Sequence, residues 1–120
     1  LADFAGGAEN LKDTYFTNHY SSSDPSPKVQ DFVKAYKDKY GVEPDSFAAL
    51  GYDAASLLAD AINRAGQAEP EAIRQALEDT KDFDGVTGNM SYDDKHNPIK
   101  EIAIIAMVDG KQTLKEKVMP

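Results

Sequence analysis

The sequence contains no cysteine and no tryptophan. The absence of cysteine excludes disulfides, thiolate nucleophiles and cysteine-ligated zinc. Basic residues are also scarce, since 13 lysines and arginines stand against 21 aspartates and glutamates, which gives a formal net charge of −8. An acidic chain repels phosphate backbones, so we expect no nucleic-acid partner. Long apolar runs are missing as well, and none approaches the roughly 20 residues of a membrane span.

What remains has the composition of a folded chain. The 120 residues are 41% hydrophobic and 28% charged, which is typical of a globular segment and excludes disorder or a fibrous repeat. The chain begins at Leu1 within a helix-like pattern over residues 1–8, without an initiator methionine or a leader. We therefore expect a fragment of a longer protein.

Signals of catalysis are absent. His19 and His96 are the only histidines, and neither has a second histidine or a carboxylate at metal-ligand spacing. No serine lies in a Gly-x-Ser-x-Gly pattern. Gly85 and Gly88 are not followed by the lysine or helix start of a phosphate-binding loop, so they indicate turn entry and close backbone packing. The sequence predicts no enzyme, no metal and no cofactor.

Apolar periodicity predicts three main helices. The first spans residues 27–40, after a serine cap and before a glycine stop, and has one buried stripe. The second spans residues 46–65, and its small and apolar residues cover most of the circumference, so we expect it to be largely buried. The third opens at Pro70 and runs to about Lys81, whose charge suits the C-terminal end of a helix.

The strands are expected around and after these helices. Residues 14–20 and 102–108 are rich in β-formers, and residues 86–92 alternate with a period of two. Asp109-Gly110 is a strong signal for a hairpin that returns over residues 111–118. The predicted fold class is α/β, with three main helices and about four strands that end in a β-hairpin.

Three residues near the start of the second predicted helix are candidates for a binding site. Phe47 and Tyr52 are aromatic residues at a helix start, where they can line a cleft beside a sheet edge. Asp53 lies in the first turns of the same helix, where the dipole stabilises a carboxylate. Periodicity alone favours the alternative that Phe47 and Tyr52 cap the core.

Two motifs then point to a family. FAALGYDA at residues 47–54 and FDGVTG at residues 83–88, in this order and after the Tyr15-Phe16-Thr17 strand, resemble the C-terminal third of the branched-chain amino-acid binding proteins of ABC transporters. These are type I extracytoplasmic solute-binding proteins with two α/β lobes joined by three crossovers. The resemblance implies that residues 1–20 and 101–120 belong to the C-terminal lobe, and residues 21–100 to the N-terminal lobe.

The same resemblance implies a function. The chain would be part of a receptor that captures a small amino acid, branched-chain or similar, and delivers it to an ABC permease without catalysis. The receptor would lie outside the cytoplasm, in the periplasm or as a lipoprotein anchored on the cell surface. Phe47 would contact the ligand side chain, and Tyr52 and Asp53 would lie near the cleft or the hinge. The alternatives are a ligand-sensing module of a signalling protein with this fold, or an interaction domain without a ligand.

The resemblance also implies what the isolated chain lacks. In this family the groups that hold the ligand's α-carboxylate and α-ammonium come from parts of the protein that precede Leu1. A zwitterion needs desolvated partners for both charges, so we expect the isolated chain not to bind an amino acid with useful affinity. Strand edges that neighbouring strands would otherwise cover favour self-association.

Overall fold

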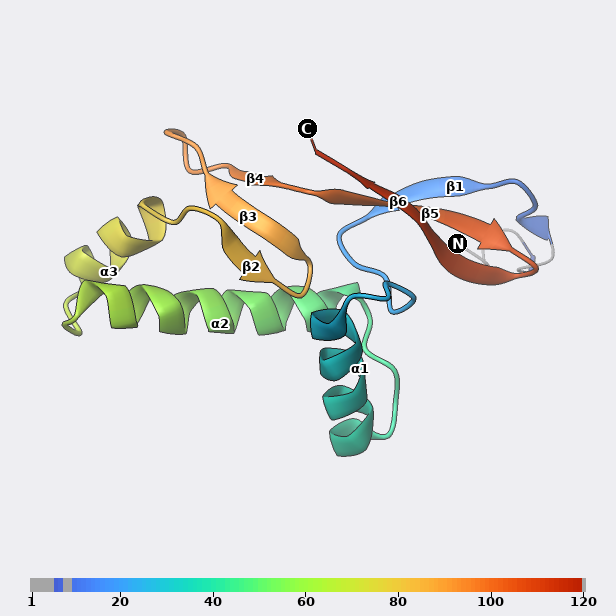
Figure 1. The fold of residues 1–120 in the computed structure, drawn as a ribbon, viewed down its shortest axis with the longest axis horizontal. Coiled ribbons are helices and arrows are strands. Elements are labelled where there is room, and N and C mark those ends of the chain that lie inside the picture. Colours follow the sequence, from blue (N-terminus) through green and yellow to red (C-terminus); the bar gives the residue numbers. More distant parts are fainter. Residues whose placement is uncertain (1–5, 8–9, 120) are drawn as a thin grey trace.

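The computed structural model describes residues 6–7 and 10–119, so the helical pattern expected over residues 1–8 lies almost wholly outside the described residues. It is a mixed α/β structure with two antiparallel sheets, ordered β1-β5-β6 and β2-β3-β4 (Figure 1). The six strands exceed the expected four because the sequence pattern does not mark two three-residue strands, at residues 83–85 and 98–100. The elements are β1 Tyr15–Asn18, α1 Pro27–Tyr40, α2 Ser46–Ala65, α3 Pro70–Glu78, β2 Phe83–Gly85, β3 Gly88–Tyr92, β4 Pro98–Lys100, β5 Ile102–Val108 and β6 Lys111–Val118.

The described chain is elongated and consists of two halves. The radius of gyration is 16.7 Å, whereas a compact domain of this length has about 14 Å. Figure 1 shows the β1-β5-β6 sheet, here called the sheet half, on one side, and the three helices with the β2-β3-β4 sheet, here called the helical half, on the other. The chain crosses between the halves at residues 19–26 and again at Glu101.

Local signals set the bounds of the first two helices. Ser26 Oγ accepts a hydrogen bond from the Val29 N–H, and Pro27 is the first residue of α1. Gly41 ends α1 in the left-handed region at φ 73°. Asp45 caps α2 by accepting from the Ala48 N–H at 2.8 Å, and α2 ends at a left-handed glycine in the same way. Both predicted helices are confirmed.

The prediction that α2 is largely buried is wrong. Its buried residues form a single stripe at a spacing of four, consisting of Ala49, Asp53, Leu57 and Ala61. Leu58 and Ile62 are 45% and 39% exposed. The reason is that α3 and β2 make the main contacts of α2 among the described residues, and its buried residues lie on one side of the helix only.

The third helix is shorter than predicted. It ends at Glu78, so Lys81 lies beyond it and does not act on its dipole. Lys81 Nζ instead donates to the Tyr92 carbonyl at 2.7 Å. The cation at the end of α3 comes from α2. Arg64 Nη1 donates a hydrogen bond to the carbonyl of Ala76, in the last turn of α3, at 2.6 Å.

Two hairpins organise the C-terminal part of the chain. Asp109 and Gly110 have φ of 49° and 75°, which confirms the predicted turn between β5 and β6. The strand expected over residues 86–92 is confirmed from Gly88 to Tyr92 as β3, whereas Val86-Thr87 forms a two-residue turn that joins β3 to β2. Gly88 has φ 106°, a conformation that favours glycine and lets the chain reverse there.

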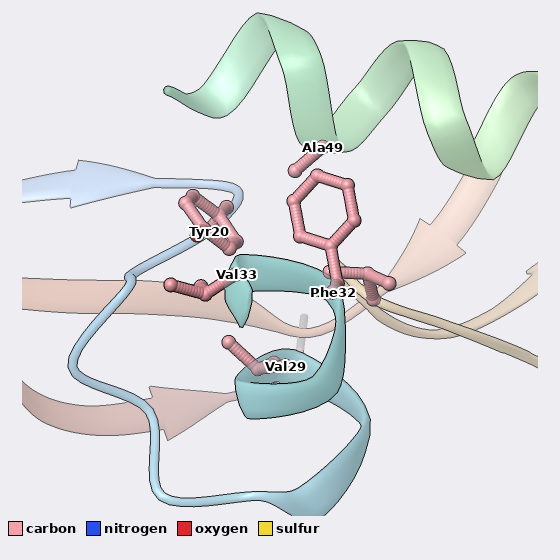
Figure 2. Packing of buried hydrophobic residues seen from close by; sticks show 6 residues of the cluster. Tyr20, Val29, Phe32, Val33 and Ala49 are labelled. Carbon is pink, nitrogen blue, oxygen red and sulfur yellow. The ribbon is translucent and has the colours of Figure 1, made fainter. Parts of the chain in front are cut away.

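The main hydrophobic cluster lies where α1, α2 and the start of the first crossing meet. Figure 2 shows Tyr20, Val29, Phe32, Val33 and Ala49 directed toward one another, and Val86 from the β2–β3 turn completes the cluster. The rings of Tyr20 and Phe32 meet edge to face, with centroids 6.1 Å apart. The cluster therefore holds α1 and the β2–β3 turn against the first turns of α2.

Replacing Tyr20 by phenylalanine is expected to stabilise the chain by about 1 kcal/mol. Within the described residues, the Tyr20 hydroxyl is buried and has no hydrogen-bond partner. Burial and the charge of Glu43 raise the pKa of Tyr20 from 10.0 to about 12. Because the folded chain resists ionisation of this phenol, the free energy of unfolding of the unmodified chain should be constant below pH 10 and should fall as the pH rises through 12. The Tyr20→Phe variant has no phenol at this position and should not show this decrease. Urea unfolding at neutral and alkaline pH measures both effects, and a destabilised Tyr20→Phe variant would contradict the first.

Candidate functional site

The side chains of the three predicted site residues, Phe47, Tyr52 and Asp53, point in different directions from α2. Because an α-helix turns by about 100° per residue, Tyr52 and Asp53 point about 100° apart, and Phe47 lies on a third side. Phe47 is 82% exposed, so the interpretation that it caps the core is wrong. Tyr52 is half-exposed and packs against Phe32, with ring centroids 5.1 Å apart, so it does border the core. The structure does not gather the three side chains in one place.

Phe47 lies at the boundary between the two halves. Its neighbour Ser46 donates a hydrogen bond through Oγ to Asn18 Oδ1 at 2.9 Å, and Asn18 is the last residue of β1. Asn18 Oδ1 also accepts from the His19 N–H at 2.8 Å. The strand end and the helix start that the sequence singled out are therefore adjacent, and they place an exposed aromatic ring beside the first crossing.

Asp53 is buried and its carboxylate is engaged inside the protein. Oδ1 accepts from the Val86 N–H and Oδ2 accepts from the Thr87 N–H, both at 2.7 Å. A Cβ added at Gly85 would lie 2.6 Å from Asp53 Oδ2. The carboxylate thus holds the β2–β3 turn against α2, and the close packing predicted for Gly85 is confirmed.

A buried lysine completes this cluster, and sequence reasoning missed it. Lys100, at the end of β4, is 9% exposed and its Nζ donates to the hydroxyl of Thr87. Burial lowers the pKa of Lys100, and the charge of Asp53 acts in the opposite direction. No local pattern marks Lys100, because only the pairing of β3 with β4 brings it to the turn.

An open groove of about 970 Å³ lies between α1, α2 and the β2 strand. Its aromatic lining consists of Phe32, Tyr36, Tyr40, Tyr52 and Phe83. Lys28 Nζ contacts the Asp84 carboxylate at 2.5 Å at the border of the groove. The groove therefore includes Tyr52 and Asp53 but excludes Phe47.

The described residues contain neither a metal-binding cluster nor a membrane-spanning helix. No group of three metal-ligating side chains occurs in the part of the chain that the structure describes. His19 is exposed, and His96 Nε2 lies 3.1 Å from Glu78 Oε1. None of the helices within residues 10–119 has the length and apolarity needed to cross a bilayer.

Comparison with known proteins identifies the class. The fold matches part of a type I periplasmic binding protein: it superposes with a TM-score of 0.79 on the leucine-binding protein LivK of Thermotoga maritima, at 35% identity, over 93% of this chain and 32% of that one. The family model of the periplasmic binding proteins matches residues 4–112. The chain belongs to the periplasmic binding protein family.

Two further relatives agree. The branched-chain amino acid transporter substrate-binding protein LivJ of Streptococcus pneumoniae, solved with isoleucine, is 38% identical and has a TM-score of 0.76, over 94% of this chain and 32% of that one. Leu/Ile/Val-binding protein homolog 1 of Brucella suis is 33% identical over 101 residues, which are 82% of this chain and 25% of that protein. The chain thus spans about a third of the solved relatives and a quarter of the Brucella protein.

Proposed function

We propose that the chain is part of an extracytoplasmic receptor that captures a small amino acid, branched-chain or similar, and delivers it to an ABC permease. The observation that carries the proposal is the match over almost the whole chain to LivJ of Streptococcus pneumoniae, whose structure holds isoleucine. Because the chain spans only part of its relatives, the ligand, the permease and the location outside the cytoplasm are all part of the proposal.

The two halves support a division between lobes. We propose that residues 1–20 and 101–120 belong to one lobe and residues 21–100 to the other. The crossings at residues 19–26 and at Glu101 fall at these boundaries. Two halves joined by short connections are the arrangement that hinge closure around a ligand requires.

Phe47 is the proposed ligand contact. Its ring is largely exposed at the boundary between the halves, where it can offer apolar surface to an aliphatic side chain. Tyr52 and Asp53 are proposed to lie near the cleft or the hinge, and the carboxylate of Asp53 is already occupied by the β2–β3 turn. None of the described residues is proposed to hold the ligand's charged groups. Self-association of the isolated chain is proposed to run through β1 and β6, which form the edges of their sheet.

A chimera tests the proposal. The third of Streptococcus pneumoniae LivJ that superposes on this chain is replaced by residues 1–120, so that LivJ supplies the remaining two thirds. Calorimetric titration is expected to show that the chimera binds isoleucine, leucine or valine, because LivJ supplies the groups for the charged ends. Phe47→Ala in the chimera is expected to weaken binding by about tenfold through the lost aromatic contact.

The controls separate binding from folding and transport from sensing. Tyr40→Ala removes another exposed aromatic, at the end of α1, and should leave the affinity unchanged. The isolated 120-residue chain should not bind in the micromolar range. Uptake of labelled isoleucine into vesicles that carry the LivJ permease is expected for transport and not for a sensory module. A folded chimera that binds no amino acid would overturn the proposal.

A further inference from the structure

The first crossing between the halves, residues 19–26, is anchored on both sides. On the helical half, Gln30 Nε2 in α1 donates to the carbonyls of Ser22 and Asp24 at 3.0 and 2.6 Å. On the sheet half, the Leu114 N–H in β6 donates to Ser23 Oγ at 2.9 Å. The segment is therefore a bonded joint and not a free linker.

Asp24 is the centre of this joint. It is 6% exposed, and its Oδ1 accepts from the Ser26 N–H at 2.9 Å, immediately before α1. Its Oδ2 lies 2.5 Å from Lys117 Nζ in β6. One carboxylate thus contacts both the entry to α1 and the edge strand of the opposite half.

This ion pair differs from the others in its surroundings. The side chain of Lys117 is 33% exposed and that of Asp24 is 8% exposed, whereas the Lys34–Asp38 pair within α1 is 76% and 65% exposed. Burial by itself would raise the pKa of Asp24, but the hydrogen bonds and charge from Lys117 and Ser26 outweigh it and the pKa lies below its ordinary value. Among the ion pairs of the described residues, Asp24–Lys117 is the one that reaches β6; the others lie within the helical half.

This partly buried ion pair joins the two halves. Removing one partner leaves the other charge in a desolvated site, so the joint must open to water to relieve it. Asp24 and Lys117 line a small cavity together with Tyr20 and Val86, so such opening lies at the edge of the main hydrophobic cluster, whose other members come from α1 and α2. Breaking the pair is therefore expected to change the angle between the halves.

We propose that Asp24 and Lys117 form a positioning pair at the hinge, which sets the angle between the helical half and the sheet half. The inference rests on the proposed function in one respect: the angle determines how Phe47 meets a ligand held from the other lobe. The geometric part of the inference stands without any ligand.

The absence of cysteine makes a direct measurement possible. Gln67, between α2 and α3, and Gln112, in β6, are exposed and can each be replaced by cysteine for spin labelling. Double electron–electron resonance then gives the distance distribution between the halves of the isolated chain. Lys117→Met and Asp24→Asn, which keeps an acceptor for the Ser26 N–H, are each expected to broaden this distribution about twofold.

The matched control is Lys34→Met, which breaks an ion pair within one half and should leave the distribution unchanged. Distributions for Lys117→Met and Asp24→Asn that coincide with that of the unmodified chain would overturn the proposal. Loss of the far-ultraviolet dichroism of both variants would also overturn it, because the pair would then hold the fold and not the angle. No amino acid is present in this experiment, so a chimera that fails to bind isoleucine leaves its result unaffected.

Discussion

Replacing Asp53 by alanine is expected to destabilise the chain by about 3–5 kcal/mol. The carboxylate accepts two hydrogen bonds of 2.7 Å from the N–H groups of Val86 and Thr87, which are 4% and 6% exposed. Without it, both buried N–H groups lose their partner, and the buried Lys100 loses the opposing charge that favours its protonated form. Urea unfolding followed by circular dichroism measures the change.

Two variants calibrate this result. Asp53→Asn keeps one acceptor oxygen but turns an amide toward the second N–H, so the free energy of unfolding of this variant should lie between those of Asp53→Ala and the unmodified chain. Asp60→Ala on the same helix removes only the exposed partner of Arg64 and should cost about 0.5 kcal/mol. A cost for Asp53→Ala as small as that for Asp60→Ala would show that the carboxylate does not hold the turn.

Replacing Gly85 by alanine is expected to destabilise the chain by about 2–3 kcal/mol. The added Cβ would lie 2.6 Å from Oδ2 and 2.9 Å from Cγ of Asp53, and the short, buried side chain of Asp53 has no room to withdraw. Gly85 does not have a positive φ, so the cost is steric and not one of backbone strain. The thermal midpoint and urea unfolding both report it.

The matched control for Gly85 lies in α2. A Cβ added at Gly51 meets no atom within 4 Å, so Gly51→Ala should stabilise the helix by up to about 1 kcal/mol. A double-mutant cycle then isolates the contact, because Gly85→Ala should cost much less in a chain that already carries Asp53→Ala. Equal costs in the two backgrounds would show that the clash with Asp53 is not the cause.

Local chemistry explains which elements were predicted well. The bounds of α1 and α2 follow from residues that act on their own backbone: Ser26 caps one helix, and left-handed glycines end both. The turn at Asp109-Gly110 requires positive φ at two adjacent positions, which these residues tolerate. Such signals involve neighbours in the chain, so they can be interpreted without knowing the fold.

The predictions that differ from the structure concern features that contacts between distant segments decide. The alternating residues 86–92 have the pattern of one strand, and residues 88–92 do form β3. Val86 and Thr87 instead form a turn, where their N–H groups donate to the Asp53 carboxylate, more than 30 residues earlier. Lys81 carries a suitable charge for a helix end, but Arg64 from α2 already occupies a carbonyl there. Phe47 is a large apolar residue of a kind that is often buried, but its ring is 82% exposed.

By itself, the sequence determined the α/β class, the bounds of the first two helices, the C-terminal hairpin and, through two motifs, the family to which the chain belongs. These follow from backbone preferences and from side chains that are neighbours along the chain. The tertiary structure alone decided that Asp53 holds the β2–β3 turn, that Lys100 is buried beside it, and that Asp24 reaches Lys117 across the crossing. These depend on long-range contacts, because a buried charge acquires its partner only when distant segments pack together.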